Sequence, residues 1–99
     1  MTVMMIRANV KREQAGVVDS TAKAMFAAIN EAQPQGVRYT SYRVGDGATY
    51  LILLELQEGI ENPLSGIAAF RSFQENLKGW LTEPPVPEQL TVVGEYRSF

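Results

Sequence analysis

The residue types that could carry chemistry in this sequence are limited, because the chain contains no cysteine and no histidine. Disulfides and thiolate nucleophiles are therefore excluded, and the side chain that most often acts as a general base or metal ligand is missing. Tyr39, Tyr42 and Tyr50 lie close together in the sequence. A tyrosine hydroxyl in a pocket can anchor or deprotonate a phenolic ligand, whereas aromatic residues are also ordinary strand residues that pack across a sheet.

Three other side chains could bind or polarise a ligand: Arg7, Asn9 and Trp80. Arg7 and Asn9 could polarise a bound carbonyl group or hold an anionic substrate. The alternative is that they end an edge of the sheet and form hydrogen bonds across a subunit interface. Trp80 could stack on an aromatic ligand, although its helical spacing from Ile67 and Leu77 is typical of a core residue.

The carboxylates give weaker signals. Glu58 and Glu61 share one loop, but two carboxylates without His or Asp support are poor metal ligands, and no metal site is predicted. Glu55 and Glu95 lie in strand-like runs together with several arginines. Such rows of charge usually form interstrand pairs rather than an acid and a base.

Charge and hydropathy exclude several classes of partner. The formal net charge of −2 gives no electrostatic reason to expect nucleic acid or an anionic membrane surface. Residues 50–55 also lack the aromatic and basic signature that an RNA-recognition motif carries on its third strand. No segment approaches the roughly 20 apolar residues that span a bilayer, and Arg7 interrupts the opening apolar run too early for a signal-peptide core. We therefore expect a cytoplasmic protein with no nucleic-acid and no membrane partner.

A hairpin over residues 37–57 is the clearest structural signal. Two β-rich runs flank Asp46-Gly47, which is among the strongest short-range hairpin signatures. With these two residues in the turn, Arg38 lies opposite Glu55 and forms a charge pair that supports the register. The second run is apolar on both faces, so both faces of the sheet must be covered.

The 99 residues are expected to form one domain, 1–99. Outside the hairpin, the spacing of apolar residues alternates between the period of a strand and the period of a helix. We expect a first strand over 3–10, a helix over 13–33, a second helix that begins at Asn62-Pro63 and ends near Leu81, and a last strand over 89–97. Residues 83–87 read as an extended, proline-rich connector. The order β-α-β-β-α-β predicts an α+β, ferredoxin-like fold with a four-stranded antiparallel sheet and two helices on one face.

The face of the sheet opposite the helices is expected to be apolar. It holds Leu51 and Leu53, together with Tyr42, Val44, Val93 and Phe99 in the predicted register. An exposed apolar area of this kind marks an interaction surface. We therefore predict a homodimer that associates through the outer sheet face.

This element order, with two amphipathic helices and an apolar outer sheet face, resembles the dimeric α+β barrel proteins, and within them the antibiotic-biosynthesis-monooxygenase-like branch. The resemblance implies a dimer with a cavity between sheet and helices in each protomer. Some members use an asparagine of the first strand, for which Asn9 is the candidate. The haem-degrading members need a histidine, which this sequence lacks. Asn9 and Tyr39 are thus the predicted catalytic residues, and Tyr50, Phe73 and Trp80 the predicted substrate-binding residues.

Two functions remain open from the sequence. The resemblance implies a cofactor-independent oxygenase that binds and orients a small aromatic molecule, which itself reacts with oxygen. The other function is a non-catalytic small-molecule-binding or homodimeric assembly module of the same fold. The two differ in whether the space between sheet and helices is an open cavity with converging polar groups or is filled by Phe70, Phe73, Trp80 and Met25.

Overall fold

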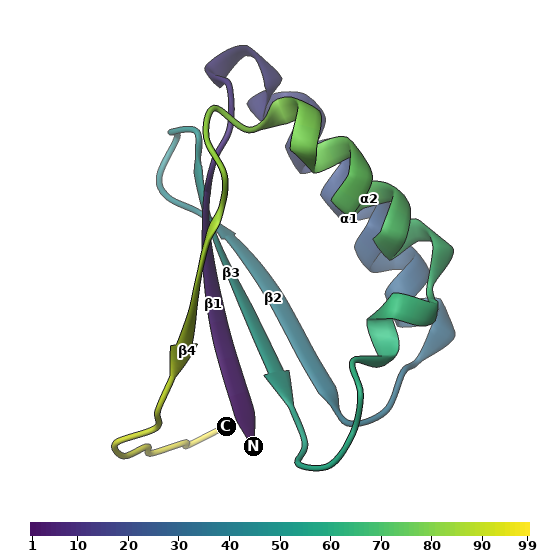
Figure 1. Ribbon diagram of the computed structural model, residues 1–99, viewed down its shortest axis with the longest axis vertical. Coiled ribbons are helices and arrows are strands. Elements are labelled where there is room, and N and C mark those ends of the chain that lie inside the picture. Colours follow the sequence, from purple (N-terminus) through teal and green to yellow (C-terminus); the bar gives the residue numbers. More distant parts are fainter.

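Four antiparallel strands form one sheet, and two helices cover one of its faces in the computed structural model, which describes residues 1–99 (Figure 1). The strand order is β2-β3-β1-β4. In chain order the elements are β1 (Thr2–Asn9), the 3-10 helix η1 (Arg12–Gln14), α1 (Ala15–Ala32), β2 (Val37–Arg43), β3 (Thr49–Leu56), the 3-10 helix η2 (Pro63–Gly66), α2 (Ala68–Trp80) and β4 (Val86–Leu90). The predicted ferredoxin-like α+β fold is confirmed.

The hairpin of β2 and β3 has the predicted register. Arg38 pairs with Glu55 across the strands, and their side chains form an ion pair of 3.7 Å. The turn closes where the amide of Gly47 donates to the carbonyl of Val44 at 3.1 Å. Gly45 has a φ of 55°, a left-handed conformation that glycine adopts without steric cost.

The second helical region differs from the single helix predicted from Asn62. The side chain of Asn62 does cap a helix, because its Oδ1 accepts from the amide of Leu64 at 3.0 Å, but this helix is only η2. Ile67 then has φ −98° and ψ 118°, which is extended backbone, and α2 begins at the next residue. The extended residue turns the chain so that α2 can lie along α1, and fully buried Leu64 anchors the break.

The last strand lies earlier than predicted. β4 covers Val86–Leu90 and contains Pro87, within what the sequence indicated as a connector, and residues 91–99 form no strand. Proline is tolerated there because β4 is an edge strand that pairs only with β1. Val93 and Phe99, expected on the outer sheet face, are fully exposed in the C-terminal segment instead.

The core lies between the sheet and the helices. From α1 it takes Val18, Met25 and Ile29, and from α2 it takes Phe73 and Leu77. Neither α1 nor α2 contains an apolar stretch of the length needed to span a lipid bilayer.

The outer face of the sheet is only partly covered. Tyr42 is 55% exposed there and Val44 is 49% exposed. Val3 of the same face is buried, because the C-terminal segment returns beside the start of β1 (Figure 1). Arg97 of this segment lies 4.0 Å from Glu55 of β3.

Candidate functional site

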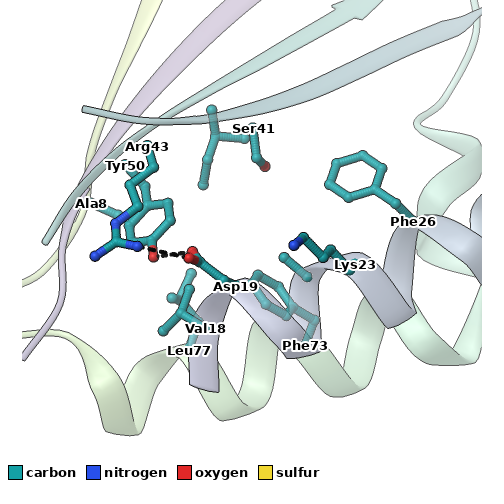
Figure 2. Close-up of a pocket in the computed structure, with 12 residues that line it drawn as sticks. Ala8, Val18, Asp19, Lys23, Phe26, Ser41, Arg43, Tyr50, Phe73 and Leu77 are labelled. Carbon is teal, nitrogen blue, oxygen red and sulfur yellow. Dashed lines mark hydrogen bonds and ion pairs between the residues drawn. The ribbon is translucent and has the colours of Figure 1, made fainter. Parts of the chain in front are cut away.

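A cavity of about 170 Å³ lies between the sheet and the helices, with α1 and β2 on its sides. Most of its wall is apolar. Figure 2 shows the side chains around it, which come from β1, α1, β2, β3 and α2; the apolar ones include Val18, Phe26, Ile52, Phe73 and Leu77. The polar groups are Asp19 and Lys23 of α1, Ser41 and Arg43 of β2, and the hydroxyl of Tyr50.

Tyr50 and Asp19 form the centre of the polar wall. Tyr50 lies on the helix side of β3 and is buried, and its hydroxyl donates to Asp19 Oδ1 at 2.5 Å. The carbonyl of Ala15, one turn earlier in α1, lies 3.2 Å from the same hydroxyl as a second acceptor. A strand and a helix thus fix the direction of this phenol.

Arg43 holds the other side of the carboxylate. Its Nη1 donates to Asp19 Oδ2 at 2.8 Å. Its Nε donates to the carbonyl of Gly47 at 2.7 Å, and its Nη2 to the carbonyl of Asp46 at 3.1 Å. The guanidinium is therefore clamped between the hairpin turn and α1 (Figure 2).

The pKa of Tyr50 is raised to about 12, first by burial and then by the hydrogen bond to Asp19 and the negative charge of that carboxylate, while the charge of Arg43 opposes the shift. Tyr50 is consequently a neutral hydrogen-bond donor at physiological pH. The arrangement is an apolar chamber with a neutral hydroxyl, a carboxylate and the guanidinium of Arg43 at one end, and with Lys23 one helical turn away from them (Figure 2). Such a chamber can bind a flat apolar molecule and orient one polar substituent.

Two of the predicted site residues line this cavity, Tyr50 and Phe73. Tyr39 does not. Its ring stacks on Phe26 with centroids 5.3 Å apart and meets Phe70 edge-on at 5.6 Å. Burial raises the pKa of Tyr39 to about 12, with Gln74 opposing the shift.

Trp80 and Asn9 also lie outside the cavity. Trp80 packs edge-on against Phe73, with ring centroids 6.0 Å apart. The amide of Asn9 donates to Glu83 at 3.0 Å, and its oxygen accepts from the hydroxyl of Thr49 at 2.7 Å. The catalytic roles of Asn9 and Tyr39 and the binding role of Trp80 stay predictions, and this cavity lends them no geometric support.

Asp19, Lys23 and Arg43 line the cavity but were not among the site residues predicted from the sequence. Two signals could have found them. Asp19 and Lys23 are four residues apart, and each directly follows an apolar residue of α1 that packs in the core, Val18 or Ala22, so they border the face that meets the sheet. Arg43 lies opposite Tyr50 in the hairpin register, which places its side chain on the helix side of the sheet.

Nowhere in the chain do three carboxylate side chains gather in a group that could hold a metal ion. No protein-family model and no curated protein matches the sequence.

Solved structures show the same fold. A provisionally assigned antibiotic biosynthesis monooxygenase from Caulobacter crescentus CB15 superimposes with a TM-score of 0.75 and 18% identity, over 94% of this chain and 90% of that one. Rv0793 from Mycobacterium tuberculosis superimposes with a TM-score of 0.74 and 17% identity, over 97% of this chain and 98% of that one. SnoaB from Streptomyces nogalater, a cofactor-independent oxygenase, superimposes with a TM-score of 0.69 and 15% identity, over 95% of this chain and 94% of that one. The resemblance to antibiotic biosynthesis monooxygenase proteins is thus confirmed as a likeness of fold.

Proposed function

We propose that this protein binds a small electron-rich aromatic molecule in the cavity beside Tyr50 and oxygenates it with molecular oxygen, without a bound cofactor. The observation that carries the proposal is the network of Tyr50, Asp19 and Arg43 at one end of an otherwise apolar cavity. The likeness of fold to SnoaB, which is a cofactor-independent oxygenase, agrees with this chemistry.

Asp19 is the general base of the proposed reaction. One of its oxygens accepts from Tyr50 and the other from Arg43, and each carboxylate oxygen retains a further lone pair. It can therefore take the proton of a substrate phenol without leaving its partners. The positive charge of Arg43 then stabilises the phenolate, because its original partner has become neutral.

The phenolate passes electrons to dioxygen, and a carbon–oxygen bond forms at a ring carbon. The O–O bond then breaks. One oxygen atom leaves as water, which takes the proton held by Asp19 and the hydrogen of the attacked ring carbon, while the other oxygen stays on that carbon and the ring becomes a quinone. The balance is one phenol and one O₂ to one quinone and one water. The protein contributes the orientation of the ring and the base.

The test is oxygen consumption by the purified protein with single-ring phenols and quinols. Asp19→Asn removes the base and should lower the rate by about 10²- to 10⁴-fold, the usual contribution of a general base. Glu75→Gln is the matched control, because Glu75 is an exposed carboxylate of α2 paired with Lys78. Oxygen uptake that is unchanged in Asp19→Asn, or absent with every compound in the parent protein, would contradict the proposal.

The second function is a non-catalytic binding module. One observation favours it: Tyr50, Asp19 and Arg43 already satisfy one another without a ligand. Such a module should show a rise in melting temperature with aromatic ligands and no oxygen uptake, so the same compounds separate the two functions.

We also infer that two copies associate through the outer sheet face. Support comes from Leu51 and Leu53, which are only half-buried in the protomer, and from exposed Tyr42 and Val44 on the same face. Burying a leucine side chain contributes about 1.5–3 kcal/mol, so a few such residues from each copy could hold a dimer together.

A further inference from the structure

We infer that the ligand of this cavity is a single aromatic ring that carries an anionic group, such as a carboxylate, in addition to its phenol. This inference rests on the proposed function, since it describes the substrate of the same cavity. It is carried by the charges in the cavity wall and by the cavity volume.

The side chains that line the cavity include two cations but only one carboxylate, so one positive charge has no counterion there. Asp19 is its only carboxylate and Arg43 and Lys23 are its cations. Both oxygens of Asp19 are engaged, one by Tyr50 and the other by Arg43. Lys23 lies one turn further along α1 and takes part in no ion pair or hydrogen bond (Figure 2).

The other two lysines of the chain each have an interaction partner. Lys78 pairs with Glu75 at 3.2 Å, and Lys11 donates to the carbonyl of Gly79 at 3.3 Å. Lys23 is thus the one lysine without a partner, and Figure 2 shows its ammonium group directed into the cavity region. In a chain with a formal net charge of −2, an unmatched cation at this position is suited to bind an anion of the ligand.

Ser41 adds a neutral donor to the same wall. It lies on the helix side of β2 between Tyr39 and Arg43, and its half-buried side chain forms no hydrogen bond within the protein. A lysine ammonium and a serine hydroxyl are both donors that a carboxylate can accept from. The phenol of the ligand would meet Asp19, and its carboxylate would meet Lys23 and Ser41.

The volume limits the size of the ring system. The cavity holds about 170 Å³, which is close to the roughly 150 Å³ of an engineered apolar cavity that binds benzene. One ring therefore fills the chamber, while fused ring systems would have to extend out of it. Phe26 and Phe73 supply aromatic faces for that ring.

Isothermal titration calorimetry with two matched probes tests the inference. The probes are 4-hydroxybenzoate and 4-hydroxybenzamide, which have the same size and the same phenol but differ in charge. The parent protein should bind the carboxylate about tenfold more tightly than the amide. Lys23→Gln should lower the affinity for 4-hydroxybenzoate about five- to tenfold and leave the affinity for 4-hydroxybenzamide unchanged. Lys23→Arg should keep the preference, and Lys78→Gln is the control for loss of a surface charge.

The outcomes distinguish this inference from the proposed function. Equal affinities of the parent protein for the two probes, or an equal effect of Lys23→Gln on both affinities, would refute the proposal that the ligand carries an anionic group. The proposal that the cavity binds an aromatic ring would still stand. Binding of neither probe would overturn both. Raising the salt concentration should reduce the preference for the carboxylate, because the ammonium group is exposed and screened. Circular dichroism checks the fold of each variant, and Gln is a good helix former at this exposed position of α1.

Discussion

Tyr50→Phe removes one hydroxyl from the cavity wall and is expected to change stability in two ways. At neutral pH it removes the hydrogen bond to Asp19. A hydrogen bond to a charged group contributes about 1.5–3 kcal/mol. Asp19 keeps Arg43 as a partner, so we expect a loss of about 1–2 kcal/mol in the free energy of unfolding.

The second effect is on the pH dependence. The pKa values of Tyr50 and Tyr39 are both raised from 10.0 to about 12. The folded state holds these protons more tightly than the unfolded state, so the stability from them is fully present below pH 10 and is lost as the pH rises through 12. At pH 11 the loss is at most about 1.4 kcal/mol for each tyrosine. Water that reaches the cavity screens the contact of Tyr50 with Asp19, so we expect a total loss of about 2 kcal/mol in the parent protein.

Urea denaturation at pH 8 and pH 11, followed by the fluorescence of Trp80, measures both effects. Between the two pH values the free energy of unfolding should fall by about 1.4 kcal/mol in Tyr50→Phe, which keeps Tyr39, and by about 2 kcal/mol in the parent protein. The double variant Tyr39→Phe/Tyr50→Phe should lose least. An equal loss in Tyr50→Phe and the parent protein would refute the reasoning, because it would mean that the folded state does not hold the proton of this hydroxyl.

Three further perturbations follow from other parts of the structure. Leu53→Glu places a charge in the outer sheet face and should convert the proposed dimer to a monomer in light scattering; a parent protein that is already monomeric at micromolar concentration would end that proposal. Arg43→Met removes the clamp on Asp46 and Gly47 and should speed amide exchange in the hairpin turn; protection like that of the parent would show that the turn is stable without it. Asn62→Ala removes the cap on Leu64 and should cost about 0.5–2 kcal/mol in chemical denaturation.

Much of the fold could be predicted because its signals are local. The Asp46-Gly47 turn and the charge pair of Arg38 with Glu55 determine the hairpin register, and the structure has that register. The break at Ile67 was missed because the residues on both sides of it continue a helical pattern, and only packing against α1 makes an extended residue favourable there. The position of β4 was missed because Pro87 argues against a strand unless the strand is known to lie at an edge.

The candidate site was less predictable for a different reason. Tyr50 and Phe73 were found because aromatic residues are conspicuous on a strand and on a helix. Asp19 was not, since a single carboxylate on a long helix looks like a solvated residue. Its role depends on the tertiary contact of α1 with β3, where the hydroxyl of Tyr50 meets it. Contacts between distant segments of this kind leave no periodic pattern in the sequence.

The alternation of β2 has a consequence for how this protein could change during evolution. Tyr39, Ser41 and Arg43 point to the helix side, while Arg38, Thr40 and Tyr42 point to the outer face. A substitution at Ser41 would alter the wall of the cavity without changing the surface proposed to bind a second copy, and a substitution at Thr40 would do the reverse. One edge strand thus allows ligand preference and self-association to diverge separately, in single mutational steps at adjacent positions.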